Sequence, residues 1–267
     1  MKNTLEHAIE WVKGRLDGKK KYETGLALSG GASRGFAHAG VIKALHENEI
    51  YPDIVAGASA GSIVGSFYCD GFAPEEIYEI FHKNKIFEII KLRFNRKGLL
   101  NINGLRKILD NNLRTKRLED LEKPFIITAT NLVEAKTEYF TEGNLVDLVV
   151  ASSSIPVIFV PTEIDGITYV DGGVTNNFPI EPLEDQCTKL IGSHVNPVGP
   201  FDPGKGILHV AATTFHLSIA AGIYHKKKKL DYFIEPSELS EFGYFDIKKG
   251  KEMYDIGYRE AINVLKG

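Results

Sequence analysis

Residues 24–35 read Thr-Gly-Leu-Ala-Leu-Ser-Gly-Gly-Ala-Ser-Arg-Gly, and this stretch indicates the fold class. Its first five residues form a short apolar run, which is typical of a buried strand. A glycine-rich turn comes next, and from Phe36 to about Glu47 apolar residues recur at helical spacing. The stretch therefore predicts a strand, a loop and a helix in direct succession.

A second unit of the same kind follows in residues 53–68. Residues 53–56 form a β-branched run, residues 57–61 read Gly-Ala-Ser-Ala-Gly, and residues 62–68 are apolar, as in a buried helix. Two such units in succession are typical of a parallel sheet with helices on its faces. The sequence therefore predicts an α/β fold, a three-layer α/β/α sandwich with a mostly parallel central sheet.

The remaining elements follow from the same patterns. Further strands are expected over residues 125–130, 137–140, 162–164, 167–170, 189–195 and 230–234, and further helices over residues 4–16, 102–113, 145–153, 207–224 and 251–265, with one more starting at Pro74. We expect a single domain over residues 1–267, with residues 1–22 as an N-terminal helical extension and residues 71–123 as a helical insertion or lid. Within that insertion, residues 86–100 mix apolar and basic side chains, which suits an interfacial lid as well as ordinary core packing.

The composition excludes several classes of protein. The 267 residues include 43% hydrophobic and 25% charged residues, which is typical of a globular chain. Lys and Arg number 32 against 35 Asp and Glu, so a net charge of −3 gives no general attraction to nucleic acid. Cys69 and Cys187 lack the spacing of a metal site and are too few for a disulfide scaffold, so we expect reduced thiols. No segment reaches the roughly 18 apolar residues of a spanning helix and no secretory signal is evident, so we expect a cytoplasmic protein, at most peripheral on a membrane.

The motif Gly57-Ala58-Ser59-Ala60-Gly61 lies between an expected strand and an expected helix. G-x-S-x-G in that setting is typical of a nucleophile elbow, a sharp turn that presents a serine hydroxyl. Gly57 and Gly61 let the backbone approach its neighbours, and the following helix directs its positive end toward charge that develops on a substrate oxygen. Ser59 is thus the candidate nucleophile. A small-residue turn without catalytic function is the alternative.

The glycine-rich loop of the first unit opens a helix and can direct several backbone N–H groups to one point. A dinucleotide-binding loop would need glycine in place of Ala32 and an acidic residue at the end of the next strand, whereas Asp53 begins that strand. No Gly-Lys-Ser/Thr follows, so a Walker loop is excluded too. Beside a nucleophile elbow, an oxyanion hole is therefore the better interpretation of the loop over residues 30–35, with the backbone N–H groups of Gly30, Gly31 and Ala32 as its donors.

The third motif is Asp171-Gly172-Gly173, directly after the strand expected over residues 167–170. An aspartate at a strand end can accept a proton from a serine hydroxyl, and Gly172 and Gly173 let the backbone turn beside it. An ordinary turn is the alternative, because Asp and Gly are common turn residues. Its position makes Asp171 the candidate general base.

Together the three motifs resemble the patatin-like phospholipase family. The stretches that carry the resemblance are residues 30–35, 35–41, 57–61 and 171–173, and the likeness extends over about residues 24–235. It is strongest to the short bacterial members, which lack added domains. The resemblance implies a single patatin-like domain and a serine–aspartate dyad that hydrolyses acyl esters, often of phospholipids.

That resemblance also assigns roles and shows one departure. It makes Ser59 the nucleophile that forms an acyl-enzyme and Asp171 its base, and it places Gly30, Gly31 and Arg34 on the oxyanion loop. The family usually carries three or more consecutive glycines in this loop, whereas this chain has only two, with Ala32 after them. Ala32 costs little there if its φ is negative.

Three alternatives remain open on the sequence. A Ser-His-Asp esterase would recruit a histidine that follows Asp171, and the candidates are His194, His209, His216 and His225. Acyl transfer to an acceptor alcohol would use the same dyad. A non-catalytic acyl-chain-binding or regulatory module would keep the pocket without the reaction. We expect His38, just past the oxyanion loop, to pack or cap.

The expected partner is a lipid or another acyl ester, without a metal or an organic cofactor, because no convincing carboxylate cluster for calcium is present. The run Lys226-Lys227-Lys228-Lys229 suits a solvated helix end, since cations favour the C-terminal dipole. Its alternative is a peripheral contact with an anionic membrane surface. Nucleic acid is not expected as a partner, and the sequence does not indicate an oligomeric state.

Overall fold

The computed structural model describes residues 20–84, 102–156, 158–199, 210, 214, 217, 220, 222–244 and 246–267. The helix expected over residues 4–16, the segment 86–100 and most of the helix expected over 207–224 lie outside these residues. The other elements form where the sequence predicts them, with ends that shift by one or two residues.

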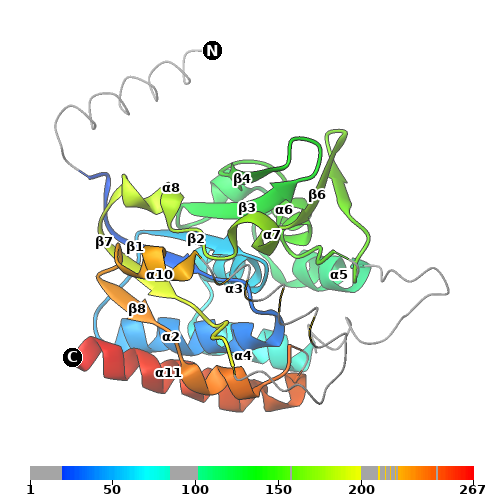
Figure 1. The fold of residues 1–267 in the computed structure, drawn as a ribbon. Helices are drawn as coiled ribbons and strands as arrows, with labels where there is room; N and C mark the ends of the chain where they lie inside the picture. Colours follow the sequence, from blue (N-terminus) through cyan, green and yellow to red (C-terminus); the bar gives the residue numbers. More distant parts are fainter. Residues whose placement is uncertain are drawn as a thin grey trace.

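The described residues form one mixed, mostly parallel sheet (Figure 1). Its strands are β1 (Tyr22–Leu28), β2 (Ile54–Ala58), β3 (Phe125–Asn131), β4 (Lys136–Phe140), β5 (Thr162–Ile164), β6 (Ile167–Asp171), β7 (Cys187–Ser193) and β8 (Tyr232–Ile234). They lie in the order β5-β6-β3-β2-β1-β7-β8, and β4 also pairs with β3. Strands β1, β2, β3, β7 and β8 run parallel, whereas β4 and β6 run antiparallel to β3 and β5 pairs antiparallel with β6.

Helices cover the sheet unequally. The large core on one face is formed by α2 (Phe36–Glu47), α3 (Ala60–Cys69), α4 (Pro74–Lys83), α5 (Asn103–Asn112), α6 (Leu145–Ser152) and α11 (Gly250–Lys266). The smaller core on the other face includes residues from α8 (Glu181–Glu184) and α10 (Ile223–Lys227). Strand residues alternate between them, since Leu26 and Leu28 join the large core and Ala27 the small one. This arrangement confirms the predicted α/β fold and its layers.

Short elements complete the chain. A single α-helical turn, α7 (Gly173–Asn176), follows β6, and 3-10 turns form η1 (Ala32–Gly35), η3 (Leu118–Asp120), η5 (Ser237–Glu241) and η6 (Ile247–Lys249). Strand β7 ends at Ser193, two residues before the predicted end, because the Val195 N–H donates to Ser29 Oγ. Cys69 and Cys187 are buried free thiols. Within the described ranges, no helix has the length and apolar character to cross a bilayer.

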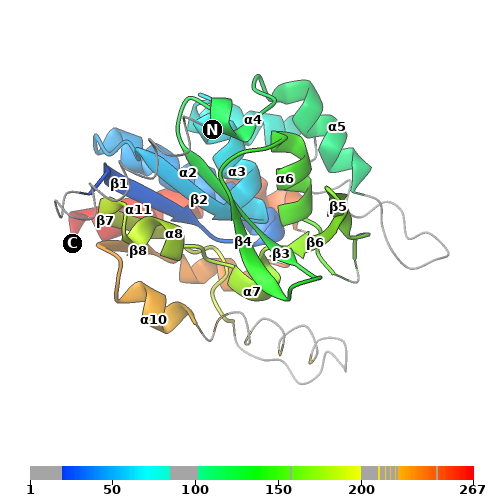
Figure 2. The same cartoon turned by 90° about the horizontal axis from the view of Figure 1, so that it is seen from above.

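Two glycines allow α2 and α11 to pack side by side, as the views in Figure 1 and Figure 2 agree. A methyl group on Gly40 would lie 2.0 Å from the Tyr254 carbonyl oxygen, and one on Gly257 would lie 2.2 Å from the Ala37 carbonyl oxygen. The helix backbones therefore touch at these points, and only glycine permits this distance.

We expect Gly40→Ala to lower the free energy of unfolding by about 2 kcal/mol. Overpacking costs about 1–3 kcal/mol, here at the upper end because backbone must move, and the better helix propensity of Ala returns about 1 kcal/mol. Urea denaturation at 25 °C measures the change. The matched control is Gly222→Ala, where an added methyl meets nothing within 4 Å. Equal stability of Gly40→Ala and wild type would contradict the close approach.

Candidate active site

Ser59 occupies a strained turn between β2 and α3. Its φ of 49° and ψ of −119° are unfavourable for a residue with a side chain, as expected for a nucleophile elbow. The flanking glycines explain how the turn fits. A methyl group on Gly57 would lie 2.5 Å from the Gly61 carbonyl oxygen, and one on Gly61 would lie 2.3 Å from the Leu28 carbonyl oxygen. The elbow is thus folded tightly against the end of β1.

A serine on α6 supports the elbow from behind. The Ser59 N–H donates to Ser152 Oγ (2.9 Å), and the Ser152 hydroxyl donates to the Thr128 carbonyl oxygen (2.7 Å). Sequence reasoning missed Ser152, and its one local signal is its place in the run Ser152-Ser153-Ser154 at the end of the helix expected over residues 145–153. The contact joins residues 93 positions apart, so only the fold reveals it.

The sheet register brings the end of β6 to the elbow. Strand β3 lies between β2 and β6, with Thr128 opposite Ala58 and Ala129 opposite Asp171. Ser59, which follows Ala58, and Asp171 therefore flank β3 at nearly the same level. The structure thus brings together the two residues that the separate motifs single out.

The Asp171 carboxyl group is buried and is a stronger base than an ordinary aspartate. Burial raises its pKa to about 6, while hydrogen bonding from the Ser59 hydroxyl and the Gly173 N–H acts in the opposite direction. Oδ1 accepts from the Gly173 N–H (2.7 Å). Oδ2 has no partner with full hydrogen-bond geometry among the described residues. The Ser59 hydroxyl therefore lies beside the carboxyl group without completing a well-aligned bond.

The loop after β1 is the predicted oxyanion hole, and its backbone N–H groups differ in their partners. The Gly30 N–H donates to the Asn177 carbonyl oxygen (2.9 Å), and the Arg34 N–H donates to the Gly31 carbonyl oxygen (3.1 Å). The N–H groups of Gly31 and Ala32 make no such bond within the described part of the chain. Ala32 has a φ of 49°, not a negative value, and this conformation costs on the order of 1 kcal/mol. This strain explains why glycine suits that position.

Arg34 anchors the glycine-rich loop after β1, because its guanidinium group bonds to residues in two other parts of the chain. Its Nε and Nη2 donate to the Phe242 carbonyl oxygen (3.1 and 2.7 Å), and Nη1 donates to Asn196 Oδ1 (2.9 Å). The guanidinium carbon also lies 4.7 Å from the centre of the Tyr244 ring. Arg34 thus ties the glycine-rich loop after β1 to the chain that leads into α11.

Among the described residues, neither His38 nor His194 forms a hydrogen bond with Ser59 or Asp171. His38 Nε2 donates to the Ser29 carbonyl oxygen (2.8 Å), so its Nδ1 accepts from the Ser193 hydroxyl (2.7 Å), and burial lowers its pKa to about 4. His194 Nδ1 pairs with Glu235 Oε1 (2.7 Å). A triad through His38 would need both of its bonds to break, and one through His194 would need a bond from Nε2 to Ser59 Oγ that the described residues do not contain. His225 lies in α10, and His209 and His216 lie outside the described residues.

The basic run is partly neutralised within the protein. Lys226 Nζ pairs with Glu181 Oε1 (2.8 Å), and Lys229 Nζ pairs with Glu184 (2.8 Å). Lys227 lies over the Phe233 ring, 4.9 Å from its centre. The run therefore connects α10 to its surroundings, which favours the structural interpretation over a lipid contact.

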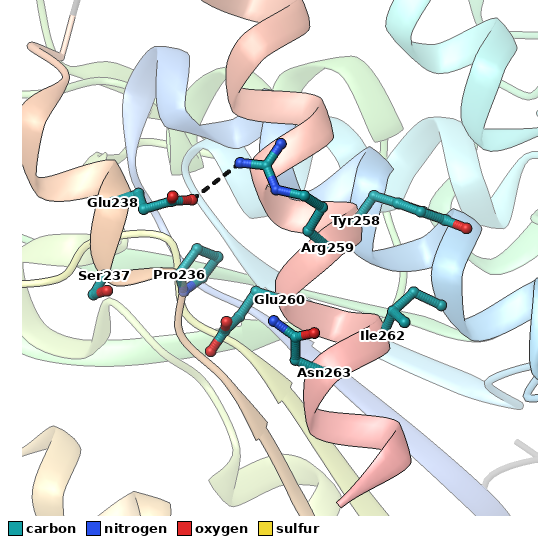
Figure 3. A pocket seen from close by; sticks show the side chains of 8 residues that line it. All are labelled: Pro236, Ser237, Glu238, Tyr258, Arg259, Glu260, Ile262 and Asn263. Carbon is teal, nitrogen blue, oxygen red and sulfur yellow. Dashed lines mark hydrogen bonds and ion pairs between the residues drawn. The ribbon is translucent and has the colours of Figure 1, made fainter.

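A pocket of about 430 Å³ opens between η5 and α11, apart from the motif residues. Figure 3 shows Arg259 directed toward Glu238 across it, and the two form an ion pair (3.2 Å). None of its lining residues belongs to the motifs above.

In the described part of the chain, no group of three His, Cys, Asp or Glu side chains could hold a metal ion.

The fold and the site together give the class of this protein. It is an α/β protein with a nucleophile elbow, in which a serine between a strand and a helix lies beside a buried carboxyl group. The family model for patatin-like phospholipase matches residues 26–184, and the chain belongs to that family.

Relatives agree with this assignment. An uncharacterised NTE-family protein of Mycobacterium tuberculosis is 28% identical over an alignment of 197 positions including gaps, which covers 71% of this chain and 55% of that protein. The lysophospholipase NTE1 of Saccharomyces cerevisiae is 24% identical over an alignment of 287 positions including gaps, which covers 91% of this chain and 16% of the yeast protein. This chain thus corresponds to about half of the mycobacterial relative and to a smaller part of the yeast one. The crystal structure of VipD from Legionella pneumophila shares the fold, with a TM-score of 0.56 and 16% identity over 93% of this chain and 67% of that one.

Proposed function

We propose that this protein is a serine hydrolase that cleaves acyl esters of lipids, of the phospholipase A, lysophospholipase or esterase type. The observation that carries the proposal is the buried Asp171 carboxyl group, with its pKa raised to about 6, beside the hydroxyl of Ser59 on its elbow. Such a carboxylate is ionised near neutral pH and basic enough to take a proton. Membership of the patatin-like phospholipase family supports a lipid as the substrate.

The reaction follows from these positions. Asp171 takes the proton from Ser59 Oγ as Oγ attacks the ester carbonyl carbon, and the carbonyl oxygen gains the negative charge. The N–H groups of Gly31 and Ala32, with the N-terminus of α3, stabilise that oxyanion. The tetrahedral intermediate expels the alcohol, which takes up the proton, and water then releases the fatty acid from Ser59.

We expect a fluorophosphonate probe to label the wild type at Ser59 and to leave Ser59→Ala unlabelled, because only the activated hydroxyl attacks phosphorus. Peptide mass mapping locates the adduct. The matched control is Ser66→Ala, since Ser66 lies on the same helix with its hydroxyl bonded to the Ile63 carbonyl oxygen (2.7 Å). Labelling of Ser66→Ala should equal that of the wild type.

Release of p-nitrophenol from esters of increasing acyl length then measures hydrolysis and its chain-length preference. A wild type that is neither labelled nor active would contradict the proposal and favour a non-catalytic binding module. Acyl glycerol as the main product in the presence of glycerol would contradict hydrolysis in favour of acyl transfer.

A further inference from the structure

Two adjacent asparagines after the Asp-Gly-Gly turn make contacts of different kinds. Asn176 is held by a polar network: its Nδ2 donates to the Tyr139 hydroxyl (2.8 Å) and to Glu181 Oε2 (2.8 Å), and its Oδ1 accepts from Lys226 Nζ (2.6 Å). These bonds explain Asn176 as a structural residue. Asn177 has none of these partners.

Asn177 instead connects the two loops of the candidate site. Its carbonyl oxygen accepts the Gly30 N–H (2.9 Å). Its side chain lies tightly against two glycines, because a methyl group on Gly30 would come within 2.2 Å of Asn177 Oδ1, and one on Gly173 within 2.7 Å. Gly30 belongs to the oxyanion loop and Gly173 to the loop of Asp171. The amide of Asn177 therefore lies between the two loops.

Ser59 and Asp171 lie at the same place. The methyl group on Gly30 would also lie 3.2 Å from Ser59 Cβ, and the one on Gly173 would lie 2.9 Å from Asp171 Oδ1. The side chain of Asn177 is thus a close neighbour of both members of the proposed dyad.

The amide of Asn177 also has an unused donor. Asn177 is 7% exposed, and its Nδ2 is buried without a hydrogen-bond partner among the described residues. Asp171 Oδ2 is buried and unpartnered in the same sense. Buried polar atoms without partners are rare, so a donor and an acceptor in this state beside one nucleophile require an explanation.

We propose that Asn177 is a positioning residue of the dyad, which holds the oxyanion loop and the Asp171 loop at a fixed separation and offers its Nδ2–H as the donor to the ionised Asp171 carboxylate. The bond forms directly after a small rotation or through one water. The inference rests on the proposed function, since it assumes that Asp171 acts as the base of Ser59.

The surroundings of Asp171 allow the effect of the Asn177 donor on the pKa of Asp171 to be measured. The groups that affect the pKa of its carboxyl are the Ser59 hydroxyl and the Gly173 N–H, and no charged side chain of the described residues does so. The neighbouring elements contribute uncharged groups, since Asp171 pairs with Ala129 of β3 and its N–H donates to the Ser154 carbonyl oxygen after α6. A change at Asn177 is therefore not masked by another titrating neighbour.

The test compares the pH dependence of kcat for ester hydrolysis in matched variants. The wild type should lose activity below an apparent pKa near 6, where Asp171 becomes protonated. Asn177→Asp keeps the shape of the side chain but places a second carboxylate beside the first, so the acid limb should move up by about one pH unit or more. Asn177→Ala should move it up less and lower kcat about 10- to 100-fold with little change in KM.

Asn176→Asp is the control, because that side chain lies in the Lys226 network and should leave the acid limb unchanged. Circular dichroism and thermal melts confirm that each variant is folded. If folded Asn177→Asp and Asn177→Ala both keep the wild-type limb, the positioning role is wrong. If Ser59→Ala retains full activity, the proposed dyad itself fails, whereas an inactive Ser59→Ala with an unmoved limb in both Asn177 variants overturns this inference alone.

Discussion

Asp171→Asn is expected to reduce ester hydrolysis by about 10²- to 10⁴-fold, the usual contribution of a general base, while making the folded protein more stable at neutral pH. The gain in stability follows from the same burial that makes Asp171 basic. Its pKa is about 6 in the folded protein against 3.8 ordinarily, so the folded state binds a proton between these values where the unfolded state has released it.

This difference in pKa decides the sign of the pH dependence of stability. The free energy of unfolding falls as pH rises through this window, and the loss persists above pH 6. It amounts to about 3 kcal/mol at most at pH 7.5, since one pKa unit corresponds to about 1.4 kcal/mol. Asparagine has the same shape without the charge. We therefore expect Asp171→Asn to be about 1–3 kcal/mol more stable than the wild type at pH 7.5 and nearly equal to it at pH 4.

Urea denaturation of both proteins at the two pH values measures the difference. His38 titrates in an overlapping range with the opposite sign, because its pKa falls to about 4 on folding and its contribution is lost as pH falls from about 6.5. That contribution is present in both proteins and cancels when they are compared at one pH.

The control for this comparison is Asp185→Asn, at an exposed position, which should change stability little at either pH. An Asp171→Asn protein that is less stable than the wild type at pH 7.5 would contradict the raised pKa of Asp171. An Asp171→Asn protein that is as active as the wild type would show that Asp171 is not the base of Ser59.

The sequence predicted the parts of the site that depend on local pattern. Residues 57–61 contain both the elbow motif and the small residues that let it fold, and residues 171–173 follow a strand with clear alternation. The register on β3 then brings these segments to the same level, although β6 runs antiparallel to β3, because Thr128 lies opposite Ala58 and Ala129 lies opposite Asp171. The α/β fold and the two candidate residues were therefore accessible from local pattern, whereas the pairing of Ser59 with Asp171 was predicted from the resemblance to the patatin-like phospholipase family.

The parts that the sequence did not predict depend on contacts between distant segments. Ser152 and Asn177 lie in helix ends and turns whose composition is ordinary, and only the register of β3 and the approach of Gly30 show what they touch. The backbone at Ala32 adopts a positive φ because of the loop around it, which no residue type signals. Arg34 fell on the predicted oxyanion loop, but its partners Phe242 and Asn196 lie 208 and 162 positions away.

Arg34→Lys is expected to destabilise the protein by about 3 kcal/mol and to lower kcat by about 10²-fold or more. Arg34 is 5% exposed, and burial lowers the pKa of its guanidinium group, so its charge is tolerated only because three N–H groups reach the Phe242 carbonyl and Asn196. A lysine ammonium cannot span both acceptors. One buried acceptor would lose its donor, at about 1–3 kcal/mol, and a poorly solvated charge would remain.

The loss of activity has a separate cause. Arg34 holds the turn whose preceding N–H groups, those of Gly31 and Ala32, are proposed to stabilise the oxyanion, and removal of one such donor typically lowers the rate about 10²- to 10³-fold. The loss should therefore appear in kcat more than in KM, because the oxyanion exists only in the transition state and the intermediate.

Thermal denaturation and steady-state kinetics of Arg34→Lys separate the two effects, and Arg34→Met provides a second variant without a buried charge. If Arg34→Met is more stable than Arg34→Lys but equally slow, the stability loss comes mainly from the unsolvated ammonium and the rate loss from the displaced loop. Arg259→Lys is the control, since Arg259 forms an exposed ion pair with Glu238 and such pairs contribute about 1 kcal/mol or less. An Arg34→Lys protein with wild-type stability and kcat would mean that the bonds to Phe242 and Asn196 do not hold the oxyanion loop in place.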